Sequence, residues 1–291
     1  MNRIRNFLIA PEWDGMTVKS YVRRVLGFSA RVLVQQRYQE GGILRNGVPC
    51  RTIDPLYAGD TLSFLLPLED PAYLAVPGTL NILYEDENFL AVNKPSAMPV
   101  HPSGTHVRDS LLNVVAYYYQ SKGEAHFFRP LYRLDRDTSG VVWIAKNRMA
   151  ASSATLTKNY YGVCHGILKG SGILNRPIGL KADSKIVREA GHGESAVTKY
   201  QVIGQEAGYT LVRFQLETGR THQIRVHLSD FGYPLAGDDL YGGTLTRIQR
   251  QALHCMETTL RCKAFQLEQV CNGSVPTDLR QSFPALFELL S

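Results

Sequence analysis

The sequence predicts an α+β fold with a mixed, largely antiparallel central sheet and flanking helices. Three observations lead to this prediction. From about residue 80 onward, short strand patterns and helical patterns follow one another in mixed order. The chain shows no internal repeat and no low-complexity tract. Its 291 residues are enough for one or two packed domains.

Two short helices are expected near the N-terminus. Thr17 is a suitable N-cap for the first helix, and Gly27 is a suitable end. Ser29 is placed to cap a second helix that runs to about Glu40, before Gly41-Gly42. One apolar stripe at helical spacing marks the first helix and consists of Val18, Tyr21, Val22, Val25 and Leu26.

Strand and turn signals follow the two helices. A hairpin is expected around the turn pair Asn46-Gly47, and residues 61–65 alternate as a strand does. The segment after this strand is rich in proline and turn residues, which is typical of a linker. We therefore assign residues 1–70 to a first domain, 71–80 to a linker and 81–291 to a second domain.

The elements of the second domain follow from the spacing of its apolar residues. Strands are expected at residues 82–84, 89–92, 141–145 and 209–216, and helices at 110–119, at 149–156 and after Thr221, which would be an N-cap. The residues expected to face the core are Leu111, Leu112, Val115 and Tyr118 in the first of these helices, and Ile224, Leu228 and Phe231 in the last.

Composition indicates a cytoplasmic protein without a membrane partner. A hydrophobic fraction of 44% and a charged fraction of 20% are ordinary for a soluble globular protein. No apolar run approaches the length of a membrane span, and the apolar core of the first ten residues is too short for a secretory signal. The 5 cysteines are odd in number and lack CxxC spacing, so neither a disulfide framework nor a zinc site is implied.

Basic residues concentrate between Met16 and Ile53, a segment with seven positively charged side chains and one negatively charged side chain, Glu40. The net charge of this segment, +6, equals that of the whole chain. A localised basic surface is the electrostatic footprint of a phosphate-binding module, although a solvated basic face without function has the same composition. The seven residues are Lys19, Arg23, Arg24, Arg31, Arg37, Arg45 and Arg51.

Two arginines alternate with two carboxylates in residues 132–140, directly before the apolar run 141–145. That run predicts a buried strand, so the charged residues lie at the edge of a core. Carboxylates in such a place must be paired, because an unpaired buried charge is costly. The residues alone fit either a structural ion-pair loop or a functional site.

The segment Arg133-Leu134-Asp135-Arg136-Asp137-Thr138-Ser139-Gly140 resembles the signature of the RluA-type RNA pseudouridine synthases. The catalytic aspartate of that family lies where Asp135 lies. Further segments match in the order found in the family, and their combination is far more specific than any one of them. These segments, which extend the resemblance over roughly residues 80–265, are Tyr84 to Ser96, Lys158-Asn159-Tyr160, Gly219 to His227, Gly237 to Gly242 and Ala252-Leu253-His254.

The resemblance implies the same α+β fold and an isomerase that converts uridine in RNA to pseudouridine. This reaction breaks the C1′–N1 bond, turns the base and rejoins it through C5, so we expect no nucleotide cofactor and no metal ion. Asp135 would either attack C1′ or abstract the C2′ proton, and the sequence leaves both routes open. Arg225 is implied to pair with Asp135 and to fix its oxygens by bidentate contact, and Tyr160 to lie against the uracil face.

Residues that bind the substrate are also implied. Arg133 is expected to position the extruded nucleotide or its phosphate. Arg220 and His222 belong to the same matched segment as Arg225 and are expected to contact the substrate as well.

The two N-terminal helices and the hairpin, with their basic exterior, resemble an S4-type RNA-binding domain. Arg23, Arg24 and Arg31 are therefore expected to contact RNA. Ribosomal RNA is favoured as the substrate, because such a module suits structured RNA recognised by phosphate position and shape, and transfer RNA stays open. We expect a monomer.

Three departures from the family pattern place the choice of substrate in doubt more than the reaction. Tyr132 replaces the usual histidine, Leu180 replaces an arginine, and the strand after Phe265 lacks the usual His-Pro. A non-catalytic RNA-binding protein on a retained synthase fold is the main alternative. A glycosidase using Asp135 and Asp137 is a more distant one.

Histidine spacing argues against a metal site. His222 and His227 are five residues apart, which separates them by about 140° around a helix, whereas an i, i+4 pair converges on one ion.

Overall fold

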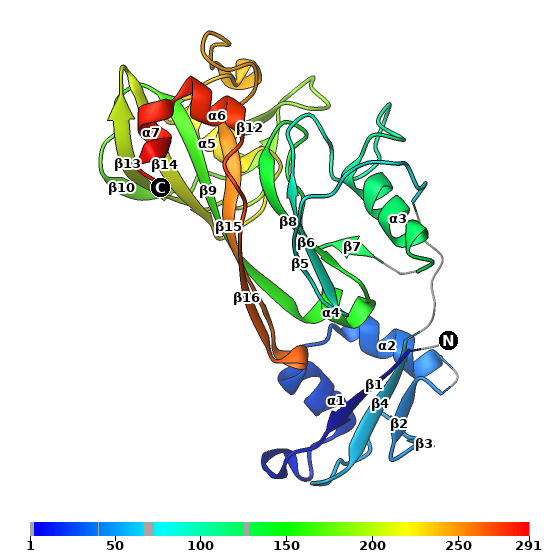
Figure 1. Ribbon diagram of the computed structural model, residues 1–291. Coiled ribbons are helices and arrows are strands. Elements are labelled where there is room, and N and C mark those ends of the chain that lie inside the picture. The colour runs from blue at the N-terminus through cyan, green and yellow to red at the C-terminus, as the bar shows by residue number, and fades with distance from the viewer. Residues whose placement is uncertain (1–2, 40, 67–72, 125–127, 291) are drawn as a thin grey trace.

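The computed structural model describes residues 3–39, 41–66, 73–124 and 128–290, and Figure 1 shows two parts built on separate sheets. The N-terminal part has a small antiparallel sheet in the order β1-β4-β2-β3. The larger part has a ten-stranded sheet. The strands of the small sheet are β1 (Arg3–Leu8), β2 (Ile43–Arg45), β3 (Val48–Pro49) and β4 (Thr61–Leu66).

The helices of the N-terminal part begin where the sequence predicts. The side chains of Thr17 and Ser29 each accept a hydrogen bond from a backbone N–H three residues later, both at 3.3 Å. Gly27 ends the first helix with a φ of 75°, which favours glycine. The second helix ends at Tyr38, before the predicted end at Glu40, which lies outside the described residues. These elements are η1 (Pro11–Trp13), α1 (Val18–Ser20), its π-helical continuation η2 (Tyr21–Val25) and α2 (Ala30–Tyr38).

The turn pair Asn46-Gly47 closes the predicted hairpin, with positive φ at both residues. The strand β1 was not predicted from the sequence. Its apolar residues do not share one face, since Ile4 and Leu8 are 56% and 71% exposed whereas Phe7 packs against the core. The predicted linker lies partly outside the described residues, and residues 73–80 form no helix or strand.

Antiparallel pairing dominates the large sheet, as predicted. Its strand order is β10-β13-β14-β9-β15-β8-β6-β5, with β16 beside β15 and β7 beside β8. Among the described strand pairs only β15 and β8 are parallel, and His254 lies opposite Ser139 there. The strands are β5 (Ile82–Glu85), β6 (Phe89–Lys94), β7 (Arg129–Pro130), β8 (Ser139–Ala145), β9 (Ala154–His165), β10 (Ser171–Leu174), β13 (Thr198–Glu206), β14 (Tyr209–Leu216), β15 (Leu253–Cys262) and β16 (Leu267–Asn272); a separate pair joins β11 (Ile178–Leu180) to β12 (Arg188–Ala190).

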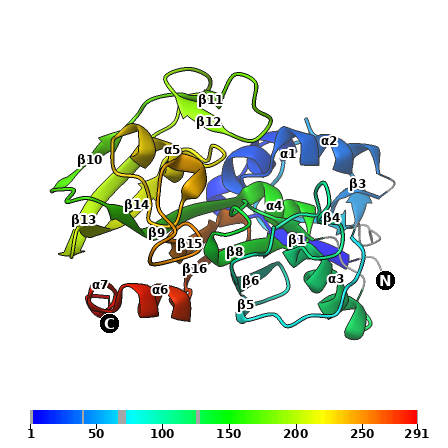
Figure 2. The same ribbon diagram turned by 90° about the horizontal axis from the view of Figure 1, so that it is seen from above.

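Helices cover both faces of this sheet. Figure 2 shows α5 on one side of β9, β14 and β15, and α6 and α7 on the other. Successive residues of β14 point to opposite faces of the sheet: Leu211 belongs to the buried cluster that contains α6 and α7, whereas Val212 belongs to the cluster that contains α5. The helical elements are α3 (Leu111–Ser121), α4 (Arg148–Ser153), α5 (Gln223–Asp230), η3 (Asp239–Tyr241), η4 (Lys263–Phe265), α6 (Thr277–Ser282) and α7 (Pro284–Glu288).

Two predictions for the helices of the larger part are wrong in detail. In α3 the fully buried tyrosine is Tyr119, whereas Tyr118 is only partly buried: it packs against the same core, and its hydroxyl donates a hydrogen bond to Glu85 at 2.6 Å. The helix expected at residues 149–156 ends at Ser153, because β9 begins at Ala154 and pairs with β15.

The start of α5 also differs from the prediction. Thr221 is not its N-cap; that position belongs to His222, which has a left-handed φ of 57°. The preceding turn is held instead by the Gln223 side chain, which accepts hydrogen bonds from Thr218 and from the Arg220 backbone. Phe231, expected in the core, is 43% exposed at the end of the helix.

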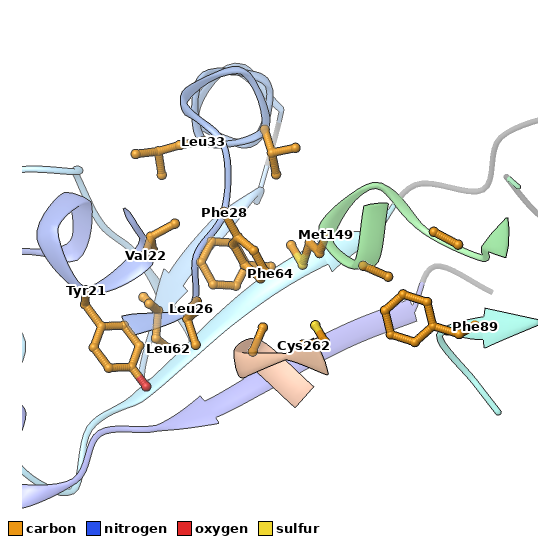
Figure 3. Close-up of a cluster of buried hydrophobic side chains, with 14 of the residues drawn as sticks. Tyr21, Val22, Leu26, Phe28, Leu33, Leu62, Phe64, Phe89, Met149 and Cys262 are labelled. Carbon is orange, nitrogen blue, oxygen red and sulfur yellow. The ribbon is translucent and has the colours of Figure 1, made fainter. Parts of the chain in front are cut away.

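The two parts share one hydrophobic core. Phe28 and Phe64 of the N-terminal part lie in the same buried cluster as Phe89, Met149 and Cys262 of the larger part, as Figure 3 shows. The long β15–β16 hairpin reaches the N-terminal part through its turn η4 (Figure 1). The small sheet is therefore packed against the large one rather than only tethered to it.

Candidate active site

A cleft of about 700 Å³ opens in the larger part, between the loop before β8 and the start of α5. Its lining includes Asp135, Tyr160 and Arg225, the three residues proposed from the sequence as catalytic. These residues come from a loop, a strand and a helix that lie far apart along the chain. The volume is within the usual range for a small-molecule or nucleoside site.

Two buried basic side chains, Lys94 and Arg250, hold the loop that carries Asp135 on its buried side. Lys94, only 1% exposed, donates hydrogen bonds to the backbone carbonyls of Pro95, Met98 and Arg136. Burial lowers the pKa of Lys94 to about 7, against a smaller opposing effect of nearby aspartates. Arg250 donates a further bond to the carbonyl of Asp137 at 3.1 Å. The loop backbone is thus fixed on its buried side.

Gly140 explains the glycine at the end of the charged motif. Its φ is 125°, and a β-carbon there would overlap the backbone of Cys255 on the adjacent strand β15. Only glycine therefore permits the parallel contact between β8 and β15 directly after the loop.

Arg225 connects two carboxylates. Its Nε and Nη2 each donate to Asp238 at 2.7 Å, and its Nη1 lies 3.4 Å from Oδ2 of Asp135. The bidentate partner is therefore Asp238, whereas the family resemblance implied Asp135. Burial alone would lower the pKa of Arg225, but the hydrogen bonds and charge of Asp238, and then the charge of Asp135, raise it. The guanidinium stays charged and points one remaining N–H edge at Asp135.

Asp238 is a site residue that was not predicted from the sequence. Its side chain is fully buried. The sequence offered one signal, since the segment Gly237 to Gly242 matched the family pattern, but nothing in the spacing showed which residue Asp238 would meet.

His222 lies on the other side of Asp135. Its Nε2 is 3.9 Å from Asp135 Oδ1, and its Nδ1 is 2.7 Å from the Tyr241 hydroxyl. The backbone N–H of Arg188 donates to that hydroxyl, which favours the hydroxyl as donor to Nδ1 and a proton on Nε2. Burial lowers the pKa of His222, so the ring is neutral at pH 7.

Tyr160 lines the cleft from β9 and is 5% exposed. Burial raises the pKa of its hydroxyl well above the usual value, and the neighbouring Cys255 raises it further. Tyr132 lies next to it and donates a hydrogen bond to the carbonyl of Val141 at 2.6 Å. The Nζ of Lys158 lies 4.6 Å from the centre of the Tyr132 ring. The tyrosine that departs from the family pattern is thus built into the floor of the cleft.

The arginines proposed as substrate-binding residues have different locations. Arg133 is exposed and lines the cleft. Arg220 also lines it, but its guanidinium contacts Glu194 and the carbonyl of Ser195.

The basic residues of the N-terminal part do not reach this cleft. Arg23 donates a hydrogen bond to the carbonyl of Phe28 at 2.6 Å, and Arg24 is exposed on the same helical segment. Arg31 lines a second, adjoining cavity.

Within the described parts of the chain, no group of three or more histidine, cysteine, aspartate or glutamate side chains is arranged to hold a metal ion. The helices described here also include none with the length and apolar character needed to span a bilayer.

Comparison with known proteins gives the family to which this fold and cleft belong. A family model described as RNA pseudouridylate synthase matches residues 88–230. A Bacillus subtilis protein named uncharacterized RNA pseudouridine synthase YjbO is 41% identical over 82% of this chain and 88% of its own length. Ribosomal large subunit pseudouridine synthase D of Pseudomonas aeruginosa is 32% identical over 82% of each chain.

A solved structure agrees with these sequence matches. Human RNA pseudouridylate synthase domain containing 1 covers 68% of this chain and 86% of its own, with 25% identity and a TM-score of 0.56. The chain therefore belongs to the RNA pseudouridine synthases, which are isomerases that act on RNA.

Proposed function

We propose that Asp135 is the catalytic carboxylate with which this chain isomerises uridine in structured RNA. The observation that carries the proposal is the contact between Asp135 and Arg225 inside a cleft of nucleoside size. Ribosomal RNA is the favoured substrate, with transfer RNA as the alternative. Relatives named ribosomal large subunit pseudouridine synthase D support the first choice.

The reaction keeps all atoms of the nucleoside. The C1′–N1 bond breaks, a C1′–C5 bond forms, and the proton on C5 is exchanged for one on N1. Asp135 would act on the sugar, by attack at C1′ or by removal of the C2′ proton. Arg225, oriented by Asp238, would hold the carboxylate of Asp135 in place.

Tyr160 would support the loose base. Its ring lines the cleft beside Asp135, and its raised pKa keeps the hydroxyl protonated at pH 7. A neutral phenol suits contact with the uracil face better than it suits removal of a proton. Arg133, exposed at the mouth of the cleft, would contact a phosphate of the extruded nucleotide.

We further propose that the N-terminal part is an S4-like RNA-binding domain, with Arg23, Arg24 and Arg31 on its RNA-facing side. The combination of two helices and a small hairpin sheet with a basic exterior supports this assignment. The enzyme would act as a cytoplasmic monomer that needs no nucleotide cofactor.

Replacing Asp135 by asparagine tests the proposal. Release of tritium from RNA labelled at C5 of uridine should fall by about 10³-fold or more, because the amide cannot supply the negative charge. The substrate would be total RNA from cells that lack the gene. Mapping the pseudouridines formed in this RNA would then identify the modified uridines.

Asp137→Asn is the matched control. Asp137 lies on the same loop but does not line the cleft, and its partner Arg136 is an exposed side chain at the edge of the cleft, so loss of Asp137 should lower the rate by no more than about tenfold, far less than loss of Asp135. Wild-type rates in Asp135→Asn, with the fold retained by circular dichroism, would refute the role of Asp135. RNA binding without any isomerisation by the wild type would favour the non-catalytic alternative.

A further inference from the structure

A second cavity, of about 780 Å³, lies between the two parts of the molecule. One wall is α2 of the N-terminal part, and the other is formed by β7 and α4 of the larger part, which lie opposite it in Figure 1. His101 and Leu131 line both this cavity and the active-site cleft. The two hollows therefore adjoin, and we call the second one the interdomain groove.

The interdomain groove is positively charged. Arg31 comes from α2, Arg129 from β7 and Arg148 from α4, and the described residues that line the groove include no aspartate or glutamate. Arg148 donates a hydrogen bond to Gln35 at 3.1 Å. Arg31 and Arg129 are exposed, and neither forms an ion pair within the described part of the chain. Exposed guanidiniums without carboxylate partners are suited to bind phosphate.

Aromatic rings lie beside these cations. The rings of Tyr73 and Phe128 have centroids 5.3 Å apart, and those of Tyr73 and His101 are 6.4 Å apart. Burial lowers the pKa of His101, and the charges of Arg133 and Arg129 lower it further, so this ring is neutral at pH 7. A neutral ring at the junction of the two hollows can stack with a base.

We propose that the interdomain groove binds a single-stranded segment of the RNA substrate that flanks the target uridine. The arginines would contact its phosphates, and the partly exposed rings of Tyr73 and His101 would stack with its bases. This inference rests on the proposed function for the identity of the ligand. Charge complementarity and continuity with the cleft support it, since a strand that leaves the cleft past His101 enters the groove directly.

The test is the double variant Arg31→Gln with Arg129→Gln, probed with fluorescently labelled oligouridylates of 3 to 12 nucleotides. Wild-type affinity should rise with length as the strand extends from the cleft into the groove. The double variant should lose this increase and bind the 12-mer about tenfold more weakly at 0.1 M salt. Its plot of log K against log salt should be shallower by about 1.4, since each phosphate contact on a single strand contributes about 0.7.

Two controls separate the groove from general charge. Arg37→Gln removes one positive charge from the helix that carries Arg31, outside the groove, and should leave the length dependence intact. Lysine at both positions 31 and 129 should restore most of the salt slope. An unchanged slope and unchanged length dependence in the glutamine variant, folded as judged by its melting curve, would overturn the proposal.

Binding also separates this inference from the proposed function. Asp135→Asn lacks the catalytic carboxylate but has the full groove, so it should keep the length dependence of the wild type. If the glutamine variant loses length-dependent binding while the wild type forms no pseudouridine, the groove stands and the proposed reaction fails. If the wild type forms pseudouridine but the glutamine variant binds oligouridylates with the same length dependence as the wild type, the proposed reaction stands and the role of the groove fails.

Discussion

Asp238 shows how one buried residue determines what a neighbouring residue can do. Arg225 is a long, flexible side chain, and Asp238 holds it by two hydrogen bonds of 2.7 Å. Only one nitrogen of the guanidinium remains directed at Asp135. The orientation of Arg225 is therefore set before the substrate arrives, which is what electrostatic preorganisation requires.

We predict that Asp238→Asn impairs both activity and stability. An asparagine keeps the shape but leaves the buried guanidinium without its main counter-charge, and breaking such a pair costs about 3 kcal/mol or more. Turnover should fall because Arg225 can then shift towards Asp135. Asp239→Asn, at the exposed neighbouring position, is the control and should change neither the melting temperature nor the rate. Equal behaviour of the two variants would contradict the role assigned to Asp238.

At the scale of residues, the sequence predicted membership of the site better than the partners within it. Asp135, Tyr160 and Arg225 were found because each lies in a segment that matches the family. Asp238 was missed because its partner is decided by how α5 packs against the following turn. Arg220 illustrates the same limit, since its guanidinium contacts Glu194 across a loop that no local pattern connects to it.

At the scale of elements, the strand β15 supports the loop that carries Asp135. Gln251, just before β15, donates to Thr138 at 3.2 Å, and His254 lies 2.9 Å from the hydroxyl of Ser139. His254 is fully buried, and its Nε2 is 3.3 Å from the carbonyl of Gly273. Its imidazole thus connects β15 to the start of β8 and to the residue that follows β16.

This arrangement predicts a pH-dependent stability. Burial lowers the pKa of His254 to about 4, from an ordinary value of 6.5. Between these two values the unfolded chain binds a proton that the folded chain does not, so the free energy of unfolding must fall as the pH drops from 6.5 towards 4. The contribution of this one residue is about 3 kcal/mol.

Urea unfolding from pH 7 to pH 4 would measure the effect. His254→Gln should be less stable at pH 7 and should lose a large share of the decline on acidification. His192→Gln, which removes an exposed histidine, should follow the wild type. A decline in His254→Gln as steep as that of the wild type would show that other groups cause the pH dependence.

Elements defined by adjacent residues were predicted well, and those defined by distant partners were not. The caps at Thr17 and Ser29 and the turn at Asn46-Gly47 involve contacts within a few residues. The end of α4 is set instead by strand pairing, because Ala154 lies opposite Cys262 of β15. Thr221 has the chemistry of an N-cap, but the Gln223 side chain organises that turn in its place.

At the scale of the whole molecule, the sequence suggested two domains joined by a linker, and the structure adds a shared core between them. Phe28 is completely buried and packs with Met149 and with the η4 turn of the β15–β16 hairpin (Figure 3). No periodicity along the chain could reveal this contact, because its members are more than a hundred residues apart. The interdomain groove depends on it, since the two walls come from the two parts.

The shared core predicts that both parts unfold in one cooperative transition. The chain has two tryptophans, Trp13 in the N-terminal part and Trp143 in the large sheet, so the variant Trp143→Phe gives a fluorescence signal from the N-terminal part alone. In that variant the fluorescence of Trp13 and the far-ultraviolet circular dichroism should change at the same urea concentration.

Adding Phe28→Ala should move both transitions together and lower the free energy of unfolding by about 3 to 5 kcal/mol, because it leaves a cavity in the common core. Adding Tyr38→Ala instead, at a side chain 75% exposed on α2, should shift them by no more than about 0.5 kcal/mol. A Trp13 signal that changes at lower urea than the circular dichroism would mean that the N-terminal part opens on its own, and the groove with it.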